Sequence, residues 1–248
     1  ILGKKERSLN EENYEKDVVY LFQFPGTKTS PSISPFSVKV EAFCRLHNIK
    51  YKKRCTIIGR GSNNKLPFVE LNGEPISDSQ ITIKRLTEKM QLQVYPDAQS
   101  AAVGHTIDRM LDIHTFKNLI FSLIIHSKLD KLGALIEKIT LSYNFPSSRF
   151  KTSVGIFTDD QYKELLRNDL VQLQTILGKK KFLLGEEPTA VDCTALGQLG
   201  VAYYTTPAAR TSFHDLLDAE ELNDLKKYVV RTKESIYGNG FYDAEAKA

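Results

Sequence analysis

The sequence predicts an α/β N-terminal half followed by an all-helical C-terminal half. Strand-like and helix-like segments alternate up to residue 94, and after Tyr95-Pro96-Asp97 the strand signals stop. The expected boundaries are a polar tail over 1–16, an α/β domain over 17–94, a helical domain over 98–240 and a C-terminal tail over 241–248.

The N-terminal half begins with a short apolar segment that ends at Pro25-Gly26 and has the character of a strand. Apolar residues then recur at the spacing of a helix with one buried face. Further on, Asn72-Gly73 between two apolar runs is typical of a hairpin turn. The expected elements are strands over 18–24 and 51–58, a hairpin over 66–76, and helices over 35–47 and 79–90.

The C-terminal half carries helix-start signals. Asp97 is a candidate N-cap, and Thr158–Gln161 and Thr189–Asp192 both have the pattern of a capping box. The first of these helices has Val103, Ile107 and Leu111 on one side. The expected helices span 98–127, 129–143, 158–177, 189–204 and 220–237, with a polar loop over 144–157.

Composition excludes several classes of protein. The chain has 248 residues, 41% of them hydrophobic and 26% charged, which is ordinary for a globular protein with a substantial core. A net charge of +4 is too small to indicate nucleic-acid binding. The sequence has no run of about 18 apolar residues, the length that would be needed to span a bilayer. The three cysteines have no metal-binding spacing, and their odd, sparse count suggests buried thiols in a reducing compartment.

Three chain corners carry candidate chemistry. Ser34 fits the N-cap of the first helix, with Pro35 in its first turn. Pro67 stands at the entrance of the hairpin, where a proline is either on a strand edge or cis. Asp78 and Ser79 stand at the N-terminus of the next helix. Because a helix N-terminus favours anions, including a thiolate, two of these corners are candidate anion sites.

These motifs, in this order, resemble the thioredoxin-like N-terminal domain of the glutathione transferases. The resemblance rests on the Ser-Pro-Phe-Ser corner at 34–37, on Lys-Leu-Pro-Phe-Val-Glu-Leu-Asn-Gly over 65–73, and on Asp78-Ser79 followed by Ile81. Within that superfamily the stretch from Val18 to Phe43 is similar to the failed-axon-connections proteins, whose relatives include the metaxins and the nematode cadmium-responsive proteins. The similarity covers roughly residues 17 to 240. It implies a glutathione transferase fold, a thioredoxin-like domain joined to an all-α domain.

The resemblance also implies a binding scheme for glutathione as substrate or ligand, with no other cofactor and no metal. In the family, the residue before a cis-proline pairs its backbone with the cysteinyl part of glutathione. That position is Leu66 here, with Pro67 as the proline, and Lys65 would contact the glycyl carboxylate.

The remaining parts of the ligand match the two helix corners. The family's acid–serine pair, which binds the γ-glutamyl group, corresponds to Asp78 and Ser79. The donor that holds the sulfur corresponds to Ser34, which would be the catalytic residue. A hydroxyl and a helix dipole together lower the pKa of a bound thiol and so favour its nucleophilic form.

The chain also departs from the family pattern at the Ser34 corner. Related redox enzymes carry cysteine where Ser34 and Ser37 stand, so disulfide exchange is excluded at this corner, and conjugation assisted by a serine hydroxyl remains. The plain structural alternatives are helix caps without a ligand at Ser34 and at Asp78-Ser79. Tyr20 could be offered as a catalytic tyrosine, but its place in the first strand favours a core role.

Two functions are therefore expected. The first is a glutathione-binding, transferase-like protein with limited or narrow conjugation activity. The second is a non-catalytic adaptor of the metaxin or failed-axon-connections type, acting in membrane-associated assembly or as a homo-oligomer. The resemblance implies a cytoplasmic or cytosol-facing location, with a stress-response role suggested only by the relatives. The chain starts at Ile1, so a membrane anchor carried by an N-terminal segment would lie outside it.

Overall fold

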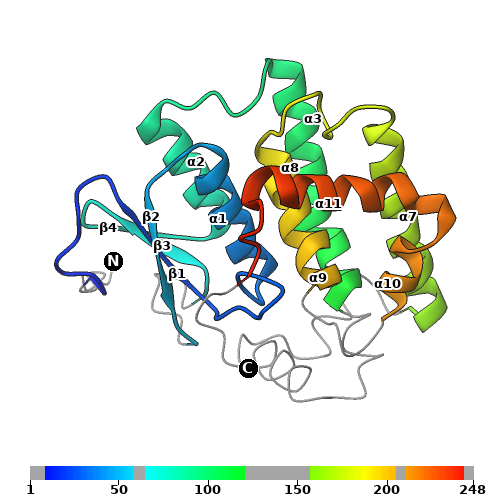
Figure 1. Cartoon of the computed structure of the whole chain (residues 1–248), viewed down its shortest axis with the longest axis horizontal. Coiled ribbons are helices and arrows are strands. Elements are labelled where there is room, and N and C mark those ends of the chain that lie inside the picture. The colour runs from blue at the N-terminus through cyan, green and yellow to red at the C-terminus, as the bar shows by residue number, and fades with distance from the viewer. Residues whose placement is uncertain (1–8, 58–64, 121–156, 205–210, 243–248) are drawn as a thin grey trace, which may run out of the picture.

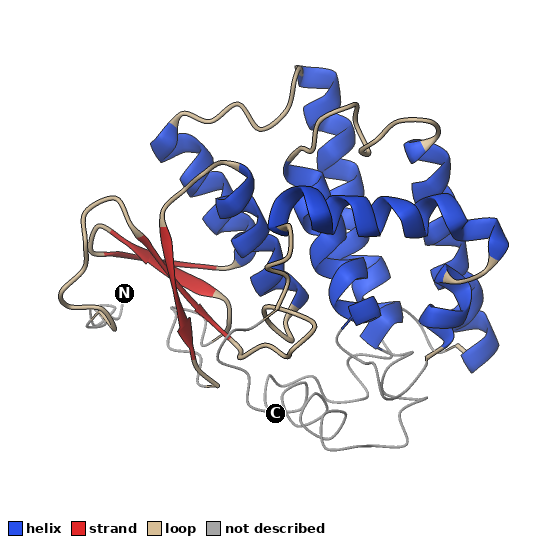
Figure 2. Ribbon diagram, viewed as in Figure 1, coloured by secondary structure: helices blue, strands red, loops and turns tan. Residues whose placement is uncertain are grey.

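The computed structural model describes residues 9–57, 65–120, 157–204 and 211–242. A four-stranded sheet and two helices form the N-terminal half, and a bundle of helices forms the rest (Figure 1). Figure 2 shows the sheet at one side of the molecule, with the helices gathered on the other. This arrangement confirms the predicted fold class, an α/β thioredoxin-like domain followed by a helical domain. The exact domain boundaries stay a prediction.

The sheet has the strand order β2-β1-β3-β4. Its central strands are β1 (Val19–Gln23) and β3 (Phe68–Leu71), which run antiparallel. β2 (Tyr51–Cys55) lies parallel to β1, and β4 (Glu74–Ser77) lies antiparallel to β3. The second strand is thus shorter than the 51–58 expected. The predicted hairpin turn is confirmed, because Asn72 and Gly73 both adopt positive φ (51° and 80°), as a type I′ turn requires.

Helix α1 (Pro35–Leu46) lies between the sheet and the helical half. All of its residues from 37 to 44 are buried. On one side it packs with β1 residues in a core that includes Val19 and Leu21. On the other side it meets the helices of the C-terminal half so closely that a Cβ added at Gly197 would lie 2.5 Å from the Pro35 carbonyl oxygen. Helix α2 (Ser79–Met90) packs beside α1 on the same face of the sheet.

The helical half begins with α3 (Ala98–Arg109), capped by Asp97 as predicted. A π-helical segment, η1 (Met110–Thr115), continues it and was not predicted. Val103, expected on the same side of the helix as Ile107 and Leu111, is 38% exposed, whereas those two residues are buried. The helix expected over 129–143 and the loop expected over 144–157 lie outside the described residues, apart from Phe157 at the loop's last position.

Later helices complete the bundle. The two predicted capping boxes are confirmed at the starts of α7 (Asp159–Leu177) and α8 (Ala190–Ala195). A second π-helical segment, η2 (Leu196–Gly200), joins α8 to α9 (Val201–Tyr204). Helix α10 (Ser212–Leu217) was missed by the sequence analysis. The last predicted helix divides into a 3₁₀ turn, η3 (Glu220–Leu222), and α11 (Asn223–Tyr237).

Candidate functional site

The sheet register brings the three predicted corners to one end of the sheet. Phe22 near the end of β1 pairs with Phe68 at the start of β3, and Phe68 pairs with Ser77 at the end of β4. Pro67 immediately precedes Phe68, and Asp78 immediately follows Ser77. The segment that leads from β1 to α1 starts at this same end. The register therefore brings Pro67 and Asp78 to one end of the sheet, and the segment that leads to Ser34 leaves β1 at that end.

Ser34 is the N-cap of α1, as predicted. Its Oγ accepts a hydrogen bond from the Ser37 amide at 3.4 Å, and its own amide donates to Ser32 Oγ at 3.2 Å. Only 8% of the residue is exposed. Because the Ser34 oxygen acts as an acceptor in this cap, its hydroxyl proton is still available for donation. The plain cap and a thiol-holding role are therefore compatible.

The hairpin entrance has a cis peptide bond between Leu66 and Pro67. Leu66 is 8% exposed and packs with the aromatic residues Phe22 and Phe68. Lys65, one residue earlier, is exposed. Of the two readings that the sequence left open for Pro67, a strand-edge position or a cis bond, the structure has the cis bond.

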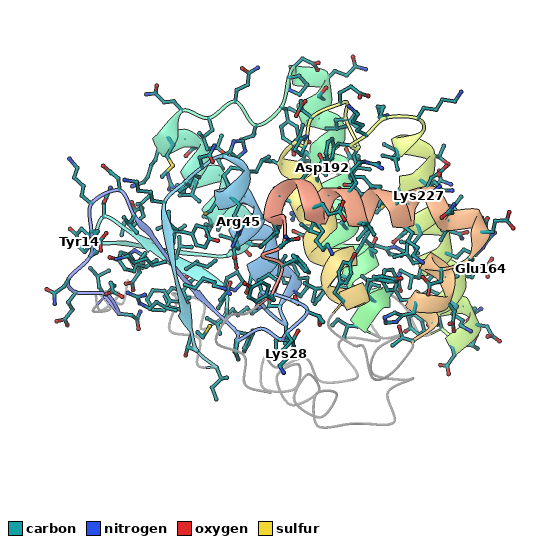
Figure 3. All side chains as sticks on the ribbon, in the orientation of Figure 1. Tyr14, Lys28, Arg45, Glu164, Asp192 and Lys227 are labelled. Atoms are coloured by element: carbon teal, nitrogen blue, oxygen red, sulfur yellow. The ribbon has the colours of Figure 1, made fainter. Side chains whose placement is uncertain are left out.

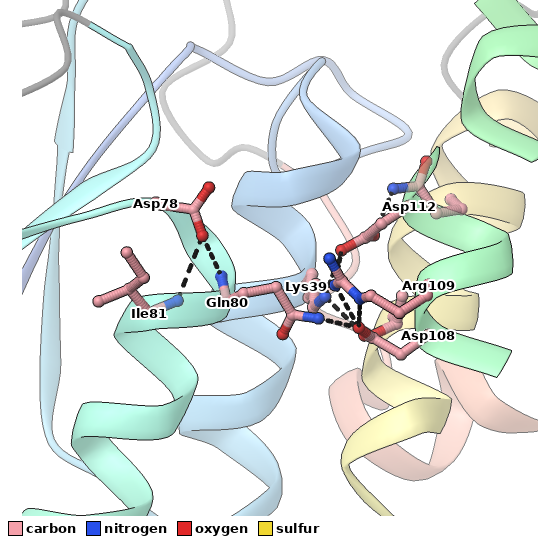
Figure 4. Close-up of polar contacts among 9 residues, drawn as sticks. Lys39, Asp78, Gln80, Ile81, Asp108, Arg109 and Asp112 are labelled. Carbon is pink, nitrogen blue, oxygen red and sulfur yellow. Dashed lines mark hydrogen bonds and ion pairs between the residues drawn. The ribbon is translucent and has the colours of Figure 1, made fainter. Parts of the chain in front are cut away.

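At the third corner, Asp78 caps α2 (Figure 4). Its Oδ1 accepts from the amides of Gln80 at 2.8 Å and Ile81 at 3.2 Å. Both bonds use the same oxygen, which leaves Oδ2 of this exposed carboxylate for a cationic group. Ser79, the first residue of the helix, is 5% exposed. The backbone of Asp78 has φ 82° and ψ 132°, a conformation that costs a non-glycine residue about 1–3 kcal/mol and that is common at binding sites.

A buried charge cluster that the sequence analysis missed lies beside this corner. Lys39 of α1 is 1% exposed, and its ammonium donates to Asp108 Oδ1 and to Asp112 Oδ2, both at 2.6 Å. Arg109, on the same helix as the two aspartates, contacts both carboxylates and keeps about a third of its side chain exposed. Two cations thus face two anions, and the cluster balances its charge.

The same cluster ties the N-terminus of α2 to the helical half. The side-chain amide of Gln80, two residues after Asp78, donates to Asp108 Oδ2 (Figure 4). Thr194 of α8 donates to Asp108 Oδ1 at 2.6 Å, and Gln198 of η2 donates to Asp112 Oδ1 at 2.9 Å. The position of the third corner is therefore fixed by contacts from both halves.

The available signal for this cluster was Lys39 itself. It lies on the buried side of α1, one turn from Phe36 and Phe43, and a lysine there is rarely left without a partner. Asp108 and Asp112 are four residues apart, so a helix presents both on one side. Their pairing with Lys39 across 69 and 73 residues of sequence could not be read from local pattern.

The remaining predicted groups have clear positions. Tyr20 is 1% exposed, which confirms the core interpretation. Cys44 and Cys193 are buried, and burial raises the pKa of both thiols and so disfavours the thiolates. Cys55 is exposed, which corrects the expectation that all three thiols are buried. Its place at the end of β2, outside the sheet's interior, explains the difference.

In the ranges given above, no three His, Cys, Asp or Glu side chains come together as they would around a metal ion. None of the helices in the same ranges combines the length and apolar character needed to cross a bilayer.

Comparison with known proteins identifies the fold family. Residues 35–129 match the glutathione S-transferase N-terminal domain, and residues 166–232 match the glutathione S-transferase C-terminal domain. The chain is 28% identical over 254 residues to Failed axon connections of Drosophila melanogaster. The match covers 93% of this chain, but the chain spans only 60% of that protein's length.

Solved structures agree in fold. A glutathione S-transferase of Methylobacterium radiotolerans, in complex with glutathione sulfonate, has a TM-score of 0.62 at 14% identity over 93% of this chain and 98% of its own. One from Ceriporiopsis subvermispora, in complex with glutathione, has a TM-score of 0.59 at 15% identity over 87% and 97%. At such identities the likeness concerns the fold alone. The two domain matches show that the chain belongs to the glutathione transferase superfamily.

Proposed function

We propose that this protein binds glutathione at the sheet end bordered by Ser34, Pro67 and Asp78. The observation that supports the proposal is the register, by which the cis bond and the start of α2 lie at the end of the sheet where the segment leading to α1 begins. The free Oδ2 of Asp78 pairs with the γ-glutamyl ammonium, and the amide and hydroxyl of Ser79 bind its carboxylate. Leu66 pairs its backbone with the cysteinyl part, and Lys65 contacts the glycyl carboxylate.

At the sulfur, the Ser34 hydroxyl donates to the thiolate at the positive end of α1. The sulfur attacks an electrophilic carbon, a carbon–sulfur bond forms, and the leaving group departs with its bonding electron pair. The thiol proton passes to solvent. Because a hydroxyl only stabilises the thiolate and does not exchange disulfides, the expected chemistry is conjugation of limited scope.

The test is calorimetric titration of glutathione into the native chain and into Asp78→Ala. A hydrogen bond to a charged group contributes about 1.5–3 kcal/mol, so Asp78→Ala should weaken the affinity roughly ten- to hundredfold. Asp97→Ala is the matched control, because Asp97 is also an exposed aspartate N-cap, on α3. Both variants lose about 1 kcal/mol of helix capping, but only the first should lose ligand.

Absence of heat with millimolar glutathione and the native chain would reject the binding proposal. Catalysis is tested separately with 1-chloro-2,4-dinitrobenzene as electrophile. Ser34→Ala should reduce kcat while leaving glutathione affinity nearly unchanged. Thr158→Ala, which removes a hydroxyl cap on α7 far along the chain, should leave both unchanged.

One observation favours the second candidate, a non-catalytic adaptor. Ser34 is 8% exposed and already serves as a helix cap, and the corner has no thiol. An adaptor of this kind would show a stable oligomer in sedimentation and no turnover, with the native corner acting only in folding. Ser34-dependent turnover by a monomer would exclude it.

A further inference from the structure

Residues 9–17 cross the face of the sheet that is opposite α1 and α2; we call this segment the strap. In Figure 1 it lies on the side of the sheet away from the helical half. The strand register defines the face beneath it in two rows. The first row is Lys52, Tyr20, Glu70 and Pro75, and the second is Arg54, Phe22, Phe68 and Ser77.

The main chain of the strap is held by one buried carboxylate. Glu70, 2% exposed, accepts from the Asn10 amide at 2.9 Å and from the Glu11 amide at 2.9 Å. It also accepts from the Asn10 side-chain amide at 2.8 Å. Further along, the Glu15 amide donates to the Tyr20 hydroxyl at 2.9 Å. Apart from the Asn10 side chain, these bonds use backbone N–H groups that any extended segment carries.

Two acidic side chains of the strap are paired with two basic residues of β2. Glu11 contacts Arg54 at 2.8 Å, and Glu15 contacts Lys52. Arg54 and Lys52 are two residues apart on the strand, so both project from the same face. The face therefore forms ion pairs with two acids that are four residues apart on the segment that crosses it.

The strap adds little apolar surface to the core. None of its side chains belongs to the buried core, which begins at Val18, and Tyr14 is 41% exposed (Figure 3). Its exposed charge pairs each contribute little to global stability. A segment held mainly by polar contacts opens at a lower free energy than the sheet below it. Asp17 and Asn72, bonded to each other at 2.7 and 2.8 Å, fix only its C-terminal end.

We propose that this face of the sheet is a binding site for an extended acidic segment of another protein, and that residues 10–15 occupy it in cis. Main-chain N–H groups satisfy Glu70, and two acids at positions i and i+4 satisfy Arg54 and Lys52. A phosphate-rich ligand fits less well, because the buried Glu70 carboxylate repels anions and requires N–H donors. The tethered strap competes at high effective concentration, so it acts as a built-in regulator of the site.

The experiment uses the full chain with Glu11→Gln and Glu15→Gln, which weakens the strap without removing it. The probe is a fluorescein-labelled peptide with the native sequence of residues 9–17, followed by fluorescence anisotropy. The peptide should bind this variant at least roughly tenfold more tightly than it binds the native chain. The reason is that the peptide keeps Glu11 and Glu15, whereas the strap of the variant has lost both charges. A peptide in which the residues equivalent to Glu11 and Glu15 are replaced by glutamine should not show this gain.

The site itself is tested in the same weakened background. Arg54→Gln should abolish the gain in peptide affinity. Lys53→Gln is the matched control: Lys53 is adjacent on β2 but pairs with Leu21 and so projects from the other face. Equal peptide affinity for the native and weakened chains, or no binding to either at millimolar peptide, would overturn the proposal.

Hydrogen exchange of the native chain gives an independent test that needs no variant. The Asn10 and Glu11 amides should exchange well before the amides of β1 and β3. If they exchange only together with the sheet, the strap opens only on global unfolding, and the proposal is wrong. Neither readout depends on glutathione, so the outcome is separate from the fate of the proposed function.

Discussion

The two faces of the sheet are covered in different ways. On one face, Val19, Leu21 and Val69 are fully buried against α1 and α2, and the contact is apolar. On the other face the strap covers Glu70 and Tyr20 through hydrogen bonds and ion pairs. The centre of each face is buried, but by interactions of different strength.

The difference indicates where the free energy of folding is concentrated. Apolar burial contributes about 25 cal/mol per Å² and is lost only when the helices separate from the sheet. Exposed ion pairs contribute about 0–1 kcal/mol each and are screened by salt. Changes on the α1 side should therefore affect global unfolding, and changes under the strap should affect local opening.

The largest effect is expected at Lys39, on the side of α1 that meets the helical half. Lys39→Met keeps the side chain's volume but leaves Asp108 and Asp112 buried, with Arg109 as their remaining charged partner among the described residues. Removing one partner of a buried ion pair costs about 3–5 kcal/mol, so the free energy of unfolding should fall by that amount. Urea denaturation measures it.

A second substitution that restores the charge balance tests whether the unpaired charge causes the loss of stability in Lys39→Met. Adding Asp112→Asn to Lys39→Met leaves one carboxylate against Arg109 and should recover part of the loss. If the double variant is no more stable than Lys39→Met, lost packing rather than an unpaired charge explains the effect.

A smaller effect is expected where α1 meets η2. In Gly197→Ala the new Cβ would lie 2.5 Å from the Pro35 carbonyl oxygen and 3.2 Å from Lys39 Cβ, so the two elements must separate. Overpacking of this kind costs about 1–3 kcal/mol.

Gly200→Ala, in the same π-helical segment, is the control. Its Cβ meets mainly the flexible end of Leu196, 2.8 Å away, and alanine adds about 1 kcal/mol of helix propensity. Gly200→Ala should therefore be neutral or stabilising in thermal unfolding, and an equal loss in both variants would contradict the close contact at Gly197.

The elements that the sequence predicted well are those specified by local residues. Pro35 after Ser34, Asn72-Gly73 between two apolar runs, and Thr189 with Asp192 each determine backbone geometry within a few positions. For the same reason the three corners of the candidate site could be predicted. Their meeting at one pocket was expected from the family resemblance and stays a prediction; the register supports it for the Pro67 and Asp78 corners.

What could not be predicted depends on contacts distant in sequence. The strap looked like a charged tail because its acids find their partners only across the sheet, with Glu11 43 residues from Arg54. Glu70 lies in an apolar strand, and nothing local shows that Asn10 and Glu11 would supply its hydrogen bonds. The π-helical segments carry Asp112 and Gln198 to the Lys39 cluster, and no period in the sequence marked them.

The smallest effect is expected at Glu11, on the strap side. The hydrogen bond from Arg54 lowers the pKa of the Glu11 carboxyl below its usual 4.5. The folded-state pKa is depressed, so this contact contributes fully when the pH is above the unfolded-state pKa. The contribution is lost as the pH falls through the folded-state pKa. Lys52 and Glu70 lie on the sheet beneath the strap, and Glu15 of the strap contacts Lys52.

The change is measured by NMR, from the titration of the Glu11 carboxyl and the exchange protection of the Glu11 amide. In the native chain the carboxyl should titrate below pH 4.5, and amide protection should fall over the same range, relative to the β1 amides. In Arg54→Gln the midpoint should return toward 4.5, while Lys53→Gln should behave like the native chain. An unchanged midpoint in Arg54→Gln would mean that the Arg54 contact does not hold the strap in solution. The strap would then be held by Glu70 and by the contacts of Glu15 and Asp17.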